Sequence, residues 1–277
     1  LSLNSFVLKK YFDKQKNQIS FISDNKLFAL SIDNQKIIFN VNKISDVQYI
    51  GTALINGKSI KRIINYNKET MAFESVIEFE SAPVSISFST EESKHKPTDS
   101  NFLMPSFEIQ DFLYKNNEGI QTENISGLKD TDSLNKEATN ISLASIGTQY
   151  FTQSYIDKSE ILPTVNMSVF GKNAKLDINY NLKNAKVNKI KNIVYIGPKS
   201  TQFLEAVDPI LPEVMNYGMF GFISKPLLTL MKFLHGIFGN WGVAIIALTI
   251  VMRLLMLPFN IMSFKSARAM QKIQPQL

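Results

Sequence analysis

Hydrophobic and polar positions alternate with a period of two through the first part of the chain, up to about residue 197. This period places successive side chains on opposite faces of a β-strand, and no helical periodicity of convincing length competes with it. Because parallel strands need crossover helices, about a dozen short strands without such helices favour a large antiparallel sandwich. The predicted strands include Phe6–Phe12, Ile19–Ile22, Leu27–Ile32, Lys36–Val41, Val76–Phe79, Val84–Phe88, Ile141–Ile146, Tyr150–Ile156, Val165–Phe170, Leu176–Leu182 and Ile190–Ile196.

Two polar stretches interrupt this rhythm, Glu91–Asn101 and Asn116–Asn140, and we expect both to be long surface loops. His95 stands between two lysines and is expected to be exposed. Acidic pairs such as Asp130 and Asp132 lack the histidine or serine that would mark a nucleophile or a metal site. Gly-rich phosphate loops are also absent from the sequence. We therefore expect a protein that is not an enzyme, without catalytic residues, cofactor or metal.

The pattern changes from strand to helix after the predicted β-domain, residues 1–198. Residues 199–221 are predicted to form a helical linker, in which Ser200 and Thr201 can cap a short helix that Pro209 ends. A linker of this kind separates the β-domain from the more apolar part of the chain.

Residues 222–239 are typical of an amphipathic helix that lies in a membrane interface. Ser224 can cap this helix, and Lys225 and Lys232 recur on one face against a broad apolar remainder. The segment is too short to cross a bilayer before Gly239 and Asn240 break it. The alternative is a core helix of the soluble domain, which its position directly before a membrane span disfavours.

Residues 240–259 are predicted to form a transmembrane helix. The run Trp241–Pro258 contains one charge, Arg253. If the helix continues to Met262, its length is about 33 Å, enough to cross a hydrocarbon core of about 30 Å. Trp241 stands where an interfacial aromatic residue is expected.

The basic residues after the span set its orientation. Lys265, Arg268 and Lys272 share one helical face, which we expect to lie in the cytoplasm and to attract anionic membrane lipids. The positive-inside rule then places residues 1–239 outside and residues 260–277 inside.

Arg253 suggests more than an anchor, because a charge within a membrane helix costs at least about 2.5 kcal/mol on insertion scales. Helical phase places Thr249 and Asn260 on the same stripe as Arg253. Two interpretations remain open from the residues alone. Arg253 either reaches the cytoplasmic head groups along its own side chain or faces a hydrated groove.

The composition of the chain further limits the classes of function that it can have. The chain has no cysteine, which excludes disulfides and thiolate metal sites, and its two histidines make a histidine-based metal centre improbable. Six of the 30 basic residues and none of the 24 acidic residues lie from Phe220 onward, so residues 1–219 are neutral. The net charge of +6 therefore reflects membrane-flanking residues, and we expect no direct nucleic-acid recognition. A domain on the outside needs an export signal, which we expect upstream of Leu1 or already removed.

The run Asn216–Phe259 (NYGMFGFISKPLLTLMKFLHGIFGNWGVAIIALTIVMRLLMLPF) closely resembles the YidC family of bacterial membrane protein insertases. Its FIS-P start, the Gly-Asn-Trp-Gly turn, Arg253 and the following Pro258 match the family in order and spacing. Upstream, Tyr195–Lys199 (YIGPK) and Gln149–Ile156 (QYFTQSYI) resemble the end of the family's periplasmic domain. The resemblance is specific over about residues 145–277.

The resemblance implies a periplasmic β-supersandwich, a protein of the bacterial inner membrane, and a role as insertase and chaperone, acting alone or with the Sec translocon. It places Arg253 in a hydrophilic groove open to the cytoplasm and to lipid, and Phe259–Leu277 at the start of a cytoplasmic hairpin. The implied partners are nascent membrane proteins, the Sec translocon with its accessory subunits, and the ribosome or signal recognition particle pathway. Four further core helices of the family are not in this chain. The alternative is a membrane-tethered periplasmic β-sandwich that binds or modifies carbohydrate.

Overall fold

The computed structural model describes residues 3–12, 16–94, 109–215, 217 and 221–273. The chain forms two compact units, Leu1–Met215 and Asn216–Leu277. The first holds all the described strands, and the second holds two long helices. Each unit is considered by itself below.

Strands of the first unit form two large sheets and one small sheet, and all the pairings between them are antiparallel. The nine-stranded sheet contains β5 (Asn40–Lys43), β6 (Gln48–Ile55), β7 (Lys58–Asn67), β8 (Ala72–Phe79), β10 (Gln110–Asn116), β11 (Gly119–Asn124), β13 (Leu143–Thr148), β14 (Phe151–Asp157) and β17 (Lys189–Pro198). The six-stranded sheet contains β3 (Ala29–Ile32), β4 (Gln35–Lys36), β9 (Ser85–Ser93), β12 (Ser133–Ala138), β15 (Thr164–Phe170) and β16 (Asn173–Asn181). The small sheet pairs β1 (Leu3–Phe12) with β2 (Gln18–Leu27).

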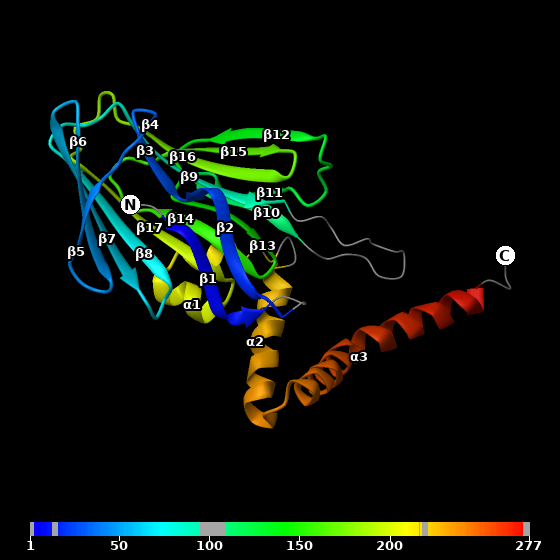
Figure 1. Ribbon diagram of the computed structural model, residues 1–277. Helices are drawn as coiled ribbons and strands as arrows, with labels where there is room; N and C mark the ends of the chain where they lie inside the picture. The colour runs from blue at the N-terminus through cyan, green and yellow to red at the C-terminus, as the bar shows by residue number, and fades with distance from the viewer. Residues whose placement is uncertain (1–2, 13–15, 95–108, 216, 218–220, 274–277) are drawn as a thin grey trace. The chain divides into compact units, whose positions relative to one another are not determined.

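The two large sheets face each other across one hydrophobic core. Strand order is β11-β10-β13-β14-β17-β8-β7-β6-β5 in the larger sheet and β12-β15-β16-β9-β3-β4 in the smaller. Buried and less buried positions alternate along β15 and β16, as the period of two requires. Ile77 and Ile146 of one sheet and Phe88 and Leu176 of the other are fully buried in the same cluster. Figure 1 shows β12, β15 and β16 in one layer and β14, β17 and β8 in the other. The mainly β, antiparallel fold is confirmed.

The prediction that Asn116–Asn140 forms a long loop is wrong, because this segment contains β11 and β12. Each is the outermost strand of its sheet, paired on one side only, with β10 and with β15. Most of their side chains are exposed or half-buried, so these strands carry polar residues and lack the alternation that marks a buried face. Glu91, predicted as loop, lies in β9, whereas residues 95–108, including His95, lie outside the described residues.

Two predicted strands are divided in the structure. Leu27–Ile32 is interrupted at Phe28, whose φ of 48° is left-handed and separates β2 from β3. Lys36–Val41 is split between β4 of the six-stranded sheet and β5 of the nine-stranded sheet. A continuous apolar run does not reveal where the chain leaves one sheet for the other.

The segment predicted as a linker belongs mostly to the first unit. It contains α1 (Thr201–Val207) and a 3₁₀ helix, η1 (Leu211–Val214). Leu204, Leu211 and Val214 are fully buried and pack in a second cluster beneath the nine-stranded sheet. Ser200 occupies the N-cap of α1, as predicted, but makes no side-chain cap hydrogen bond. Apolar contact therefore joins this segment to the sandwich, and the boundary lies after Met215.

The second unit consists of α2 (Gly221–Phe238) and α3 (Trp241–Ile273). Ser224 lies inside α2 and is not its cap, because the helix begins at Gly221. Helix α3 continues through Pro258 to Ile273, so it carries both the predicted span and the basic residues that follow. The membrane boundaries at residues 240, 259 and 260 remain predictions.

Candidate functional site

A tight turn joins α2 to α3. Gly239 has φ of 65°, a left-handed conformation that glycine adopts without steric cost, and its N–H donates to the His235 carbonyl at 2.8 Å. Asn240 Oδ1 accepts hydrogen bonds from the N–H groups of Gly242 (2.8 Å) and Val243 (3.4 Å) and caps α3. The predicted break between the two helices is confirmed.

Helix α2 occupies one side of α3. The rings of His235 and Trp241 stack with centroids 3.8 Å apart and planes 16° apart. Leu234 of α2 and Ala244 of α3 are buried, with 9% and 0% of their surface exposed. Helical phase places the half-buried Val251 on the same side of α3 as Ala244. This side of α3 therefore packs against α2.

Arg253 lies on the opposite side of α3. At about 100° per residue it is about 180° around the helix from Ala244, whereas Thr249 and Asn260 lie within about 40° of it. Arg253, Thr249 and Asn260 are all exposed. The Thr249 hydroxyl donates to the carbonyl of Ile245 at 2.9 Å, so its oxygen remains able to accept from water or substrate. The predicted groove residues thus share one stripe that faces away from α2.

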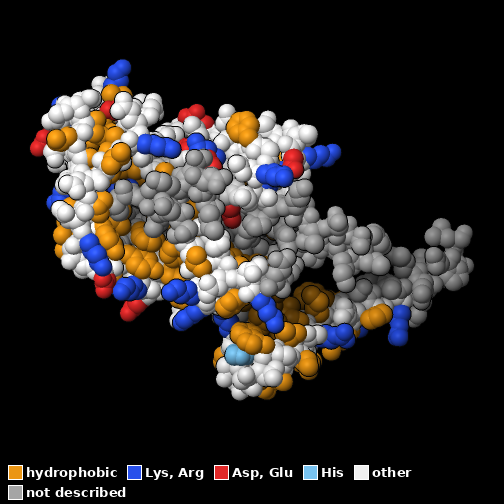
Figure 2. All heavy atoms as spheres, in the orientation of Figure 1, with side chains coloured by type: hydrophobic (Ala, Val, Ile, Leu, Met, Phe, Trp, Pro, Cys, Tyr) orange, Lys and Arg blue, Asp and Glu red, His pale blue; other side chains and the backbone are white. Residues whose placement is uncertain are grey.

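The residues predicted for the interfacial helix also share a face. Lys225 and Lys232 are exposed and lie about 20° apart around α2, roughly opposite Leu234. Lys225 Nζ is 5.4 Å from the ring centroid of Tyr217. Exposed apolar side chains of α2 and α3 include Phe222, Phe233, Ile237, Trp241 and Ile246. Figure 2 shows hydrophobic atoms, in orange, gathered around the pale blue histidine of this unit. An interfacial position for α2 is consistent with this surface and remains a prediction.

Among the described residues, one helix is long and apolar enough to cross a membrane, with the candidate span Trp241–Lys265 and a mean hydropathy of 2.2. Trp241, at its start, is half exposed. Lys265 and Arg268 are exposed at and after its end, whereas the side chain of Lys272 lies outside the described residues. An aromatic residue at one end and cations at the other are typical of a membrane helix.

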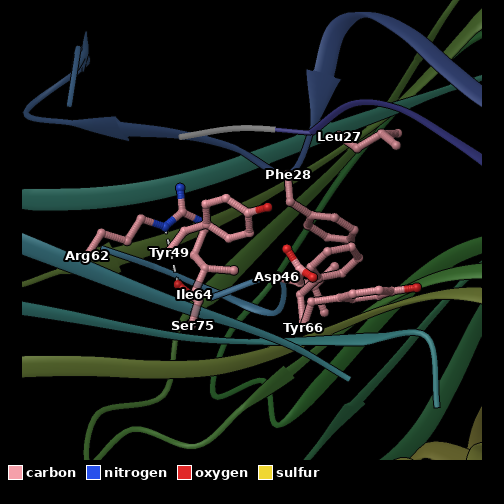
Figure 3. Close-up of a pocket in the computed structure, with 10 residues that line it drawn as sticks. Leu27, Phe28, Asp46, Tyr49, Arg62, Ile64, Tyr66 and Ser75 are labelled. Atoms are coloured by element: carbon pink, nitrogen blue, oxygen red, sulfur yellow. Dashed lines mark hydrogen bonds between the residues drawn. The ribbon is translucent and has the colours of Figure 1, made fainter. Parts of the chain in front are cut away.

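The first unit contains a pocket of about 350 Å³ that sequence reasoning missed. Its lining comes from β6, β7, β8 and β17, from the turn before β6 and from the end of β2 (Figure 3). Arg62 of β7 is 95% buried at this pocket, and its Nε donates to Ser75 Oγ at 3.2 Å. Burial lowers the pKa of Arg62 to about 10, so the guanidinium stays charged at neutral pH. The sequence signal that could have revealed this pocket is the spacing of two between Arg62, Ile64 and Tyr66, which places an arginine on the same strand face as two apolar residues.

A chain of buried hydroxyl groups lies deeper in the sandwich. The hydroxyl of Tyr180 donates to Asp157 Oδ1 at 2.5 Å, so the hydroxyl of Tyr155, 2.8 Å from that of Tyr180, donates to it in turn. Burial raises the pKa of Asp157, an effect that the hydrogen bonds from Tyr180 and Ser159 oppose. No group of three or more His, Cys, Asp or Glu residues suited to a metal ion occurs in the part of the chain that the structure describes.

A β-sandwich domain followed by a helical hairpin with an apolar helix of membrane-spanning length is typical of a membrane-anchored protein. Comparison with known protein families identifies the family to which this membrane-anchored protein belongs. The family model described as "YidC periplasmic domain" matches residues 56–230, and that described as "60Kd inner membrane protein" matches residues 233–277. The chain belongs to the YidC family of membrane protein insertases, whose members are inner-membrane proteins with a periplasmic domain.

Three relatives show the extent of the similarity. Membrane protein insertase YidC of Pseudoalteromonas translucida is 31% identical over 191 residues, which cover 68% of this chain and 34% of the relative. The YidC insertase of Cellvibrio japonicus is 46% identical over 88 residues, 32% of this chain and 16% of the relative. That of Bordetella pertussis is 39% identical over 84 residues, 30% of this chain and 15% of the relative. The chain thus spans about a third or less of the relatives it matches.

Proposed function

We propose that this chain is part of a membrane protein insertase and chaperone in which Arg253 lies in a hydrophilic groove within the membrane. The observation that carries the proposal is the position of Arg253 on α3. It shares an exposed stripe with Thr249 and Asn260, on the side of the helix opposite Ala244, which packs against α2. An intramembrane cation that faces away from its neighbouring helix needs water or a partner from elsewhere.

The chemistry of this stripe suits transient binding of a translocated polar segment. A positive charge in a water-containing groove bounded by lipid attracts an acidic segment more strongly than the same charge in bulk water does, because the surrounding dielectric is lower. Thr249 offers an acceptor oxygen and Asn260 offers both donors and acceptors. Burial of the substrate's apolar helix in lipid then drives its release, so no covalent step, nucleotide or cofactor enters the mechanism.

The partners follow from the same proposal. Nascent membrane proteins are the substrates, inserted alone or with the Sec translocon and its accessory subunits. Delivery by the ribosome or the signal recognition particle pathway fits a cytoplasmic position for Lys265 and Arg268, and membrane lipids contact α2 through Lys225 and Lys232. Anionic lipid attracts such exposed lysines by about 1 kcal/mol each near the surface.

The proposal predicts that Arg253→Ala in the full-length protein impairs insertion of a small membrane protein with an acidic periplasmic tail. Loss of a hydrogen-bonded charge pair worth about 1.5–3 kcal/mol should slow insertion by about tenfold or more. A client whose tail carries no charge should be affected less. Protease accessibility of the tail in insertase-depleted cells measures both rates.

Leu254→Ala is the matched control, because it truncates an exposed apolar side chain of the same helix, about 100° around the helix axis from Arg253, and removes no charge. It should leave insertion of both clients close to that of the parent. If the parent and Arg253→Ala inserted the client with the acidic tail at the same rate and at equal protein levels, Arg253 would have no role in the mechanism. Failure of the well-expressed parent to support any insertion would overturn the proposed function as a whole.

A further inference from the structure

The pocket in the first unit has an apolar floor that the sheet register holds in place. Tyr66 of β7 stands opposite Phe73 of β8, and their rings stack with centroids 4.6 Å apart. Val194 of β17 pairs with Phe73 and extends this floor. Phe28, at the left-handed break between β2 and β3, points its side chain toward that of Tyr66 (Figure 3). The volume of about 350 Å³ lies within the usual range of a small-molecule site, roughly 300–1,000 Å³.

The charged groups of the lining are already engaged. The Nε atom of Arg62 donates to Ser75 Oγ at 3.2 Å, and its guanidinium lies 5.7 Å from the ring centroid of Phe88. Asp46 forms an ion pair of 2.7 Å with Lys43, and its side chain is 77% exposed to water, which weakens its attraction for a ligand. A charged ligand would lose its hydration without gaining a matched partner. The pocket therefore suits an uncharged molecule.

Ser75 supplies a hydrogen-bond donor at the wall of the pocket. It is part of the lining, and 3% of its surface is exposed. Its oxygen accepts from Arg62, and its O–H donates to no group in the part of the chain that the structure describes. A serine hydroxyl has one proton to donate, and buried polar groups are nearly always paired. This proton therefore requires an acceptor that enters the pocket.

Asn192 of β17 borders the pocket with an unpartnered amide. It is 2% exposed, and neither its Nδ2 nor its Oδ1 has a hydrogen-bond partner among the described residues. In the register Asn192 stands opposite Ser75, and it shares a strand face with Val194, so lining residues flank it on two sides. Residues directly opposite each other have Cβ atoms about 4.5–5.5 Å apart. One polar group of a ligand on this side of the pocket can thus reach both Ser75 and Asn192.

A carboxamide matches these two side chains. Its carbonyl oxygen accepts from the Ser75 hydroxyl and from Asn192 Nδ2, and its N–H donates to Asn192 Oδ1. A carboxylate only accepts and an ammonium group only donates, and each also carries a charge into an apolar site. A sugar presents hydroxyl groups around its whole ring, more than these two residues can pair. The simplest rival is a buried water, which also pairs with amides of this kind.

We propose that this pocket binds a small uncharged aromatic ligand, with its ring on the Tyr66–Phe73 floor and a carboxamide-like end at Ser75 and Asn192. The ring gains by leaving water and by contact with other aromatic rings. The polar end satisfies buried groups that the described protein leaves unpaired. The site lies in the β-domain and does not depend on the insertion mechanism.

Isothermal titration calorimetry of the whole chain in lipid nanodiscs tests this, with empty nanodiscs subtracted. The probes are naphthalene-2-carboxamide, naphthalene-2-carboxylate and naphthalene, which share one ring system and differ in the end group. The carboxamide should bind about tenfold or more tightly than the other two. A carboxylate that binds as tightly as the carboxamide would overturn the proposal, because the site would then accept an anion.

Asn192→Leu separates a ligand from a buried water. The substitution keeps the size of the side chain and removes polar atoms that lack a partner, so the thermal midpoint of the ligand-free chain should rise. It should lower the affinity for the carboxamide about tenfold and leave the affinity for naphthalene close to that of the parent. An unchanged affinity for the carboxamide would show that Asn192 does not contact the ligand and would overturn the assigned site.

Ile64→Trp fills the pocket and should abolish binding of the carboxamide and of naphthalene. Its matched control is Leu54→Trp, on the adjoining strand β6, whose side chain is 76% exposed and does not line the pocket. Circular dichroism confirms that each variant is folded. Carboxamide binding that survives in folded Ile64→Trp would show that the ligand binds elsewhere.

Discussion

Asp157 shows how a single buried carboxyl group should make stability depend on pH. Its pKa is raised by burial, so the folded chain holds this proton at a higher pH than the unfolded chain does. Where the folded state binds more protons, the free energy of unfolding falls as pH rises. This contribution is therefore greatest in acid and is lost as pH rises through the raised pKa.

The prediction is a difference between Asp157→Asn and the parent. The free energy of unfolding of the variant, relative to the parent, should increase as pH rises from about 4, the ordinary pKa of Asp, and then level off. Urea unfolding of a chain ending at Met215, followed by circular dichroism, measures it. Tyr180→Phe removes a hydrogen bond that lowers the pKa of Asp157, so it should move the change to higher pH. A difference that does not vary with pH would contradict this account.

At the scale of a single element, the turn between α2 and α3 depends on one helix cap, Asn240. Asn240→Ala removes the acceptor of the N–H groups of Gly242 and Val243 and should destabilise the first turn of α3 by about 1 kcal/mol. Hydrogen–deuterium exchange at these amides in nanodiscs should then be about fivefold faster. Asn240→Asp keeps the acceptor and serves as the control. Unchanged exchange in Asn240→Ala would show that the stack of His235 on Trp241 holds the turn without the cap.

Strands with one buried face were predicted from the sequence, and edge strands were not. β15 and β16 alternate clearly because their inner positions pack in the core. β11 and β12 pair on one side only, so few of their positions need to be apolar, and periodicity cannot find them. The left-handed break at Phe28 was hidden for a different reason, since a bulky residue with positive φ leaves no compositional signal.

The boundary between the two units is a property of the whole molecule that composition did not reveal. The prolines near residue 210 led to the prediction of a linker, yet Leu204, Leu211 and Val214 are fully buried against the sandwich. A chain ending at Pro198 loses three buried aliphatic side chains, each of which contributes about 1.5–3 kcal/mol before the cost of ordering the segment, and should therefore be less stable than one ending at Met215 by several kcal/mol. Urea midpoints of the two chains measure this, and equal midpoints would show that α1 and η1 add nothing.

The two candidate sites differ in how far the sequence predicted them. Arg253 was noticed because a charge within an apolar helix is conspicuous, and Thr249 and Asn260 lie on the same face of α3; that the three residues line a groove remains a prediction. The pocket at Arg62 was not found, because its walls come from strands and turns far apart in the sequence. Only the register between β7 and β8 brings Ile64 and Ser75 together.

Cysteine accessibility along α3 tests the central claim, that the Arg253 stripe faces water within the membrane. The chain contains no cysteine, so single cysteines can be placed on the stripe, at Ile246 and Thr249, and on the opposite side, at Leu248 and Val251. The full-length protein is used, with any other cysteines replaced. A thiol reacts as the thiolate, which forms in water and not in hydrocarbon. The account predicts rapid labelling by a membrane-impermeant maleimide at Ile246 and Thr249 and slow labelling at Leu248 and Val251. Equal, slow labelling at all four positions would contradict it.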